Sequence, residues 1–380
     1  MADSFERILG QPQVRRFLRA IVKGGRIGHA YLFTGPAGSN KTLAAYALAQ
    51  AVICENGGCG ECDACNRVMR RSHPDVRYFA PEGSATYLVS QIREVVADVD
   101  MAPIQAKSKV YIIDRADLLG VQAANAFLKT LEEPPEGVVI ILLGRTRESV
   151  LPTIVSRCQV VPFRHIPVGE ACGIVSQNTG VSRQRAAISI QACGGSITKA
   201  MEFAKSTERF EFRARVIEAM ESLRLADDLD ILEYASDLIE RAKAPLDLVR
   251  SEQERELASS ADLLAKSALR QIEQRHKRAL SAKTVESLSQ ITAIVRSWLR
   301  DVLMICGGTP QLVINEDVRS GLEEAAAVTT APRLANALRV VDETDTAIAY
   351  NVSPETCIDV LFLQTREALY GTHSTGNVAI

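Results

Sequence analysis

Residues 33–43 read FTGPAGSNKTL, and this stretch decides the fold of the first part of the chain. The apolar run AYLFTG (30–35) leads into it, and a helical pattern, LAAYALAQAVI (43–53), follows it. A strand, a glycine-containing turn and a helix in this order form the arrangement in which backbone N–H groups and a helix N-terminus bind phosphate. The stretch therefore predicts a phosphate-binding loop within an α/β sheet.

The loop departs from the pattern G-x-x-x-x-G-K-[ST] at one position, because Asn40 stands where the last glycine belongs. Asparagine tolerates a positive φ better than most residues, so we expect the loop to keep its shape while the side chain crowds the phosphates. Two interpretations stay open: a site that binds ATP with Mg²⁺, and a scaffold loop that binds nucleotide weakly or not at all. The candidate nucleotide-binding residues are Gly35, Gly38, Asn40, Lys41, Thr42 and Asp114.

A second apolar run, VYIIDR (110–115), predicts the strand that carries the metal-binding carboxylate. Asp114 is present, but Arg115 occupies the next position, where a hydrolysing enzyme of this layout carries the glutamate that polarises water. An arginine cannot accept a proton at neutral pH. We therefore expect no intrinsic ATP hydrolysis.

Working outward, a third apolar run, GVVIILLG (137–144), and the helical stretches between the runs predict a parallel α/β core over residues 1–165. The strand signal then fades. We expect a small helical lid domain over 166–207 and an all-α domain that mediates oligomerisation over 208–370. The last ten residues, 371–380, lack periodicity and are expected to be disordered.

Four cysteines lie within twelve residues in the insert CENGGCGECDAC, at 54–65. Four thiolates at such spacing can close tetrahedrally on Zn²⁺, and a site with four cysteine ligands leaves no open position for catalysis. The insert predicts a structural zinc site whose ligands are Cys54, Cys59, Cys62 and Cys65.

The composition is typical of a water-soluble protein, with 47% apolar and 24% charged residues and a net charge of −2. No stretch approaches the ~20 apolar residues that span a bilayer, and the charged start MADSFERILG does not resemble a secretory signal. We expect a cytoplasmic protein without membrane contact, in which any contact with nucleic acid is a local patch.

Several motifs together resemble one family. They are the near-phosphate loop, the cysteine insert, HPDV (73–76), IIDRADLLGVQAANAFLKTLEEPP (112–135), LPTIVSRCQ (151–159), GGSITKA (194–200) and NVSPETCIDVLFLQ (351–364). The chain resembles bacterial DNA polymerase III clamp-loader subunits over nearly its whole length. The resemblance implies an AAA+ core, a helical lid and a helical collar, within a ring that places a sliding clamp on primer–template DNA.

Within that family the chain is most similar to the delta-prime type, a rigid stator without ATPase activity of its own. The ATP-hydrolysing gamma/tau type has an intact loop and a glutamate after the aspartate, whereas this chain has Asn40 and Arg115. In GGSITKA, Thr198 or Lys199 takes the place of an arginine that contacts the γ-phosphate in gamma/tau.

The resemblance assigns Arg157 of Ser156-Arg157-Cys158 the role of an arginine finger that acts in trans on a neighbouring subunit's ATP. Its implied partners are the gamma/tau and delta subunits, and through the assembled complex the sliding clamp and primer–template DNA. Two alternatives stay open: a gamma/tau-like ATPase motor, and an AAA+ adaptor with no role at the clamp.

Overall fold

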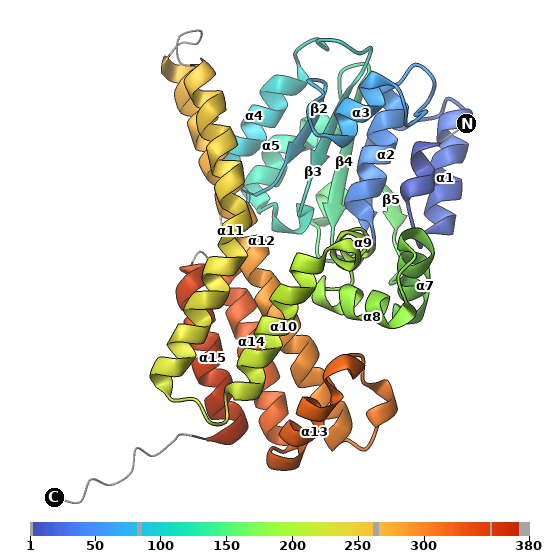
Figure 1. Ribbon diagram of the computed structural model, residues 1–380. Helices are drawn as coiled ribbons and strands as arrows, with labels where there is room; N and C mark the ends of the chain where they lie inside the picture. Colours follow the sequence, from blue (N-terminus) through green and yellow to red (C-terminus); the bar gives the residue numbers. More distant parts are fainter. Residues whose placement is uncertain (1–2, 82–85, 261–265, 350–351, 372–380) are drawn as a thin grey trace, which may run out of the picture. The chain divides into compact units, whose positions relative to one another are not determined.

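The computed structural model describes residues 3–81, 86–260, 266–349 and 352–371. The chain divides into two compact units (Figure 1). The first unit comprises Met1–Gly180 and Gly194–Lys199, and the second comprises Val181–Cys193 and Ala200–Ile380.

The first unit contains a five-stranded parallel sheet. Its strands are β1 (Ala30–Thr34), β2 (Val76–Phe79), β3 (Lys109–Ile113), β4 (Val138–Gly144) and β5 (Gln159–Pro162). They lie in the order β2-β3-β4-β1-β5, and every neighbouring pair is parallel. The central strand β4 is buried along its whole length, as expected for a parallel sheet covered on both faces.

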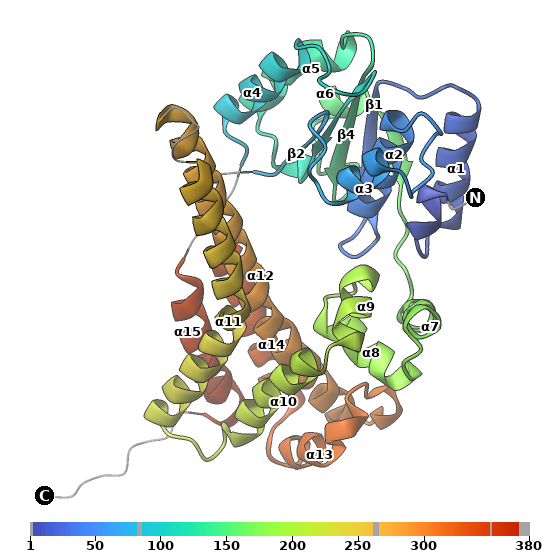
Figure 2. The same cartoon turned by 45° about the horizontal axis from the view of Figure 1, so that its top comes forward.

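Successive residues of each strand point to opposite faces of the sheet, and each face packs against its own helices. Tyr31 and Phe33 of β1 pack on one face with α1 (Pro12–Lys23) and α2 (Lys41–Ile53). Leu32 of the same strand packs on the other face with α4 (Val89–Val99) and α5 (Val121–Glu132). Figure 2 shows the sheet between these two helical layers.

The remaining elements of the first unit connect these layers and complete the end of the sheet. They are η1 (Ser4–Arg7), α3 (Asp63–Met69), η2 (Ala116–Leu118), α6 (Pro152–Val155), α7 (Val168–Thr179) and the first residues of α9 (Ile197–Lys205). Helix α5 ends at Glu132, two residues before the prolines at 134–135, which cannot continue a helix.

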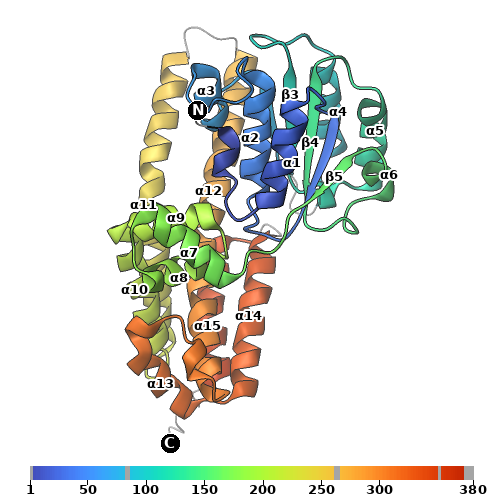
Figure 3. The same ribbon diagram turned by 90° about the vertical axis from the view of Figure 1, so that its right-hand side faces the viewer.

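Every secondary-structure element described in the second unit is a helix. Its elements are α8 (Arg183–Ala192), the rest of α9, α10 (Thr207–Ser222), α11 (Asp228–Ser260), α12 (Lys266–Cys306), η3 (Pro310–Leu312), η4 (Glu316–Val318), α13 (Arg319–Val328), α14 (Ala331–Ala349) and α15 (Pro354–Tyr370). The long helices α11 and α12 pack side by side (Figure 3), as do α14 and α15. Trp298 and Phe362 lie in its fully buried core.

The predicted fold class is confirmed, since a parallel α/β core is followed by a helical C-terminal region. The division at residues 165 and 207 stays a prediction. The predicted disordered tail lies outside the described residues except for Gly371, and so does Asn351, the first residue of the motif at 351–364. Within the described ranges, every helix is too short or too polar to cross a membrane.

Candidate nucleotide loop, metal centre and exposed arginine

The candidate nucleotide loop joins β1 to α2 at the carboxyl end of the sheet, as the sequence predicts. Asn40 precedes α2 in the left-handed conformation, with φ 66° and ψ 24°. Its side-chain amide donates to the carbonyl of Leu9 over 2.9 Å, and its carbonyl oxygen lies 3.5 Å from the hydroxyl of Thr198. The asparagine that replaces glycine is therefore tethered to the protein through its side chain.

The surroundings of Gly38, in the same loop, leave no room for a side chain. Gly38 has φ +76°, and a Cβ at this position would lie 2.6 Å from the carbonyl oxygen of Gly195. The loop and the GGSITKA segment thus approach each other at a distance that no other residue type allows.

Lys41 folds back onto its own loop. Its Nζ donates to the carbonyls of Gly35 and Pro36 over 2.5 and 2.7 Å, and it lies 3.3 Å from the Ser39 hydroxyl. Burial lowers the pKa of Lys41, while Asp114 and Asp117 act in the opposite direction. A lysine has three donor hydrogens, and the loop supplies three acceptors for them.

Asp114 lies where the sequence predicts, directly after β3, but its carboxylate is occupied. One oxygen accepts the Tyr78 hydroxyl over 2.6 Å, and the other accepts the backbone N–H of Arg115 over 2.9 Å. The Tyr78 ring stacks on Tyr46, and the Arg71 guanidinium lies over both rings. A metal ion at Asp114 has to compete with these donors.

Arg115 also adopts the left-handed conformation, with φ 50°, and its Nε donates to Asp117 over 3.2 Å. The Asp117 side chain is 8% exposed, and its second oxygen, Oδ1, has no hydrogen-bond partner among the described residues. The position next to Asp114 therefore carries a cation paired with a buried acid. The low exposure of the Asp117 side chain depends on the fold and could not be predicted from the sequence.

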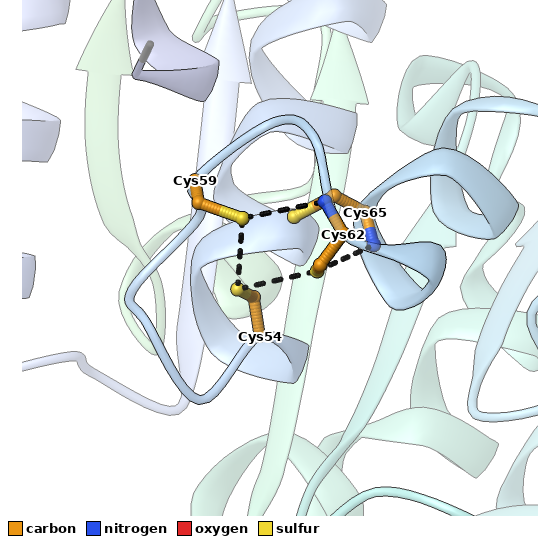
Figure 4. Close-up of side chains that lie close together, drawn as sticks. All are labelled: Cys54, Cys59, Cys62 and Cys65. Carbon is orange, nitrogen blue, oxygen red and sulfur yellow. Dashed lines mark hydrogen bonds between the residues drawn. The ribbon is translucent and has the colours of Figure 1, made fainter. Parts of the chain in front are cut away.

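The four predicted metal ligands meet at one point (Figure 4). Their Sγ atoms all lie within 4.8 Å of one another, and the Cys54 Sγ is 3.8 Å from that of Cys59 and 3.6 Å from that of Cys62. Zn–S bonds of about 2.3 Å in a tetrahedron place sulfur atoms about 3.8 Å apart. The geometry of the donor set thus fits Zn²⁺.

The insert reaches this geometry through its turns and backbone donors. Gly58 has φ +90°, and a Cβ there would lie 2.6 Å from the Ser4 hydroxyl oxygen. Burial raises the pKa of the Cys54 thiol, but backbone N–H groups, those of Cys59 and Gly58 first, outweigh it and lower that pKa to about 6. Donors of this kind favour the thiolate that a metal requires.

Arg157 follows α6 at the surface and makes its contacts away from the nucleotide loop. Its Nε and Nη2 both donate to Oε1 of Glu132, the former over 2.6 Å, and its Nη1 donates to the carbonyl of Thr153 over 2.9 Å. Burial raises the pKa of the neighbouring Cys158 thiol to about 12, so this cysteine stays protonated at neutral pH.

Asp75 of the HPDV segment is a further residue whose role the sequence did not reveal. Its carboxylate, which is fully buried, accepts the backbone N–H groups of Ile104, Gln105 and Ala106 over 2.6–2.8 Å. It fixes the loop between α4 and β3. Only the tertiary structure could show this contact, because about 30 residues separate the partners.

Comparison with known proteins finds sequence similarity to subunits of DNA polymerase III. A family model described as "DNA polymerase III, delta subunit" matches residues 10–167. DNA polymerase III subunit delta' of Bacillus subtilis (strain 168) is 32% identical over 217 residues, which are 56% of this chain and 65% of the relative. Subunit tau of the same organism is 33% identical over 270 residues, which are 64% of this chain and 48% of that protein.

The chain therefore spans less than two thirds of the length of either relative, and the two identities do not separate delta' from tau. A solved structure of a DNA polymerase III gamma subunit-related protein from Thermotoga maritima is 19% identical; the match covers 94% of this chain and 99% of that one, with a TM-score of 0.45.

The sequence matches to several DNA polymerase III subunits agree with the parallel α/β core, the near-phosphate loop and the helical C-terminal region. The chain is thus similar in sequence to several DNA polymerase III clamp-loader subunits, of the delta' and the tau type.

Proposed function

We propose that this chain is a delta-prime-like stator of the DNA polymerase III clamp loader. In this role it helps to place the sliding clamp on primer–template DNA without hydrolysing ATP in its own loop. Its partners are the gamma/tau and delta subunits, and it reaches the clamp and the DNA through the assembled ring.

The observation that carries the proposal is Arg115, in the position of the missing glutamate. Its guanidinium is paired with Asp117, and a permanently charged group cannot activate water as a base. Two further contacts support the absence of turnover, since Lys41 is bound by its own loop and Asp114 by Tyr78.

Arg157 supplies the catalytic group of this function, as a finger in the ATP site of a neighbouring gamma/tau subunit. A planar, permanently charged guanidinium stabilises negative charge on a phosphoryl group in transfer. The side chain is 30% exposed, and two of its acceptor residues, Glu132 and Thr153, are themselves exposed. It is thus accessible to a second chain.

The cysteine insert holds a structural Zn²⁺ in this proposal. Four cysteine ligands fill the tetrahedron, so the ion takes no part in phosphoryl transfer. Its contribution is to fix the insert against α2 and α3, which carry Cys54 and Cys65 at their ends.

A gamma/tau-like motor is the second candidate, and specific observations favour it. Lys41, Thr42 and Asp114 are retained, and the Asp117 side chain, which is 8% exposed, has one oxygen without a partner in the described part of the chain. In this alternative Asp117 replaces the missing glutamate, and the isolated chain or its homo-oligomer hydrolyses ATP.

A titration of the purified chain with Mg-ATP, with phosphate release followed in parallel, separates the two candidates. We expect no turnover. Binding without turnover would assign the loop as a structural nucleotide site, and the absence of binding would assign it as a scaffold. Turnover that disappears in Asp117→Asn would establish the motor instead.

The finger is tested by Arg157→Ala in a clamp loader reconstituted with the other subunits of the same organism. We expect the ring to assemble and the adjacent ATP site to lose activity on the order of 10³-fold, with slower clamp loading. Loading kinetics equal to those of the unmodified complex would contradict the assignment of Arg157.

A further inference from the structure

Among the described residues, Glu132 is the one acidic residue that forms an ion pair with Arg157. It is the last residue of α5, immediately before the Glu-Pro-Pro segment that ends the helix. Arg157 lies 25 residues later, in the turn between α6 and β5. Both elements belong to the first unit and pack against each other.

The guanidinium is held on two sides. Glu132 takes the edge formed by Nε and Nη2, and the Thr153 carbonyl and the Ser156 hydroxyl take Nη1 over 2.9 and 3.1 Å. Within the described part of the chain, Nη2 donates to one acceptor, Glu132 Oε1, although it carries two hydrogens. The arrangement leaves a donor for a further acceptor and fixes the plane of the group.

We propose that Glu132 is the positioning residue of the arginine finger, an inference that rests on the function proposed for Arg157. A long arginine side chain loses considerable rotamer freedom when it is ordered. The contact with Glu132 orders it before the neighbouring subunit arrives, so the fork already has the orientation that phosphoryl transfer needs.

Because the Arg157–Glu132 ion pair is exposed, we expect its loss to affect the position of Arg157 more than the stability of the fold. The side chains of Arg157 and Glu132 are 30% and 46% exposed, and ion pairs at such sites contribute little to stability. A glutamine at 132 keeps an oxygen that can accept from Nε and Nη2, whereas an alanine removes the acceptor. The two substitutions therefore distinguish the effect of the hydrogen bonds that orient Arg157 from the effect of the negative charge of Glu132.

The experiment compares Glu132→Ala, Glu132→Gln, Arg157→Ala and the Glu132→Ala/Arg157→Ala double variant in the reconstituted clamp loader, with primer–template DNA and clamp present. For Glu132→Ala we expect kcat for ATP to fall on the order of 10-fold with an unchanged KM, because a misplaced catalytic group lowers the rate of the chemical step. We expect Glu132→Gln to restore most of the rate. Glu133→Ala is the matched control, since this glutamate is also exposed and the hydrogen bonds of Arg157 within the described residues go to Glu132, Thr153 and Ser156 instead.

In the double variant we expect the rate of Arg157→Ala alone, because Glu132 acts through the arginine. If Glu132→Ala lowers kcat by the same factor with and without Arg157, the inference is overturned. ATPase rates above that of the unmodified complex in both Glu132 variants would also overturn it, because the ion pair would then inhibit the reaction. A full rate for Glu132→Ala beside a reduced one for Arg157→Ala would refute the role of Glu132 and leave the finger in place. If Arg157→Ala has no effect, the proposed finger and this inference both fail.

Discussion

Two residues that depart from the pattern of a hydrolysing ATPase, Asn40 and Arg115, share an unusual backbone. Their φ values are 66° and 50°, and Arg71, which covers Tyr46 and Tyr78, has φ 58°. Left-handed residues other than glycine are uncommon and often mark sites under functional constraint. In this chain Asn40 keeps a left-handed backbone where the loop pattern has a glycine, and Arg115 has the same conformation directly after Asp114.

Asn40→Gly restores the sequence pattern of the loop, and we expect it to produce no ATP turnover because Arg115 remains. The unfolding free energy should fall by about 1 kcal/mol, since the hydrogen bond to Leu9 is lost. Asn40→Ala is the control for backbone strain and should lose about 1–2 kcal/mol more. Denaturant unfolding and phosphate release measure both effects, and turnover by the glycine variant would refute the argument from Arg115.

Asp75 is a residue whose charge stabilises a loop. Burial raises the pKa of Asp75, but the N–H groups of Ile104, Ala106 and Gln105 outweigh it and leave that pKa below its usual value. A carboxyl whose folded-state pKa is depressed stabilises the protein fully above the unfolded pKa of about 4. This contribution is lost as the pH falls through the folded-state pKa.

Asp75→Asn should therefore lower the unfolding free energy by about 2–3 kcal/mol at neutral pH, because an amide oxygen replaces a charged acceptor of three N–H groups. The difference between the variant and the natural chain should shrink as the pH falls below about 4 and should go on shrinking as the pH passes through the lower folded-state pKa. Denaturant unfolding across this range checks the expectation. A difference that is independent of pH would show that the Asp75 charge does not act through these contacts.

At the scale of elements, the cysteine insert is the connection between α2 and α3. Cys54 is the residue after α2, and Cys62 caps α3 by accepting the N–H of Cys65 through its sulfur. The connection has little apolar surface of its own, since Cys59 and Cys62 are half-exposed. A metal ion on the four cysteines would therefore hold the insert in a fixed conformation.

Removal of the metal should loosen this insert and leave the sheet folded, because the core of the first unit is buried independently of it. A chelator, or Cys59→Ser together with Cys62→Ser, should abolish bound zinc and lower the Tm, with the strands retained. Metal analysis, thermal unfolding and hydrogen exchange at residues 54–65 check this. Cys306→Ser is the control and should keep the metal, and a zinc-free natural chain would refute the site.

For the molecule as a whole, the two units interleave along the chain instead of meeting at one linker. Residues 181–193 belong to the second unit, although 194–199 belong to the first. Phe203 is fully buried in the core of the second unit, against Phe210 with ring centroids 5.0 Å apart. Arg185 covers the Phe210 ring and donates to the carbonyl of Ala204.

A fragment that spans 181–371 should therefore be more stable than one that spans 208–371. The shorter fragment lacks Phe203 and Arg185, and the loss of a buried phenylalanine costs roughly 3 kcal/mol or more. Chemical unfolding of the two fragments measures the difference. Equal stability would show that α8 and α9 do not contribute to the core of the second unit.

The sequence by itself determined the parallel α/β core, the helical C-terminal region, the composition of the nucleotide loop and the cysteine set. These follow from local information, because strand and helix periodicities and ligand spacing are written within short stretches of chain. The sequence also shows directly that Arg115 stands where the motif of a hydrolysing enzyme has a glutamate, because a single position decides this.

Only the tertiary structure decided which distant groups meet. Several contacts join residues far apart in the chain: Arg157 with Glu132, the three N–H groups with Asp75, and the Tyr78 hydroxyl with Asp114. The interleaving of the two units is likewise a property of the fold. Such contacts depend on how buried surfaces pack and on where each polar group finds a partner, and one local stretch of sequence specifies neither.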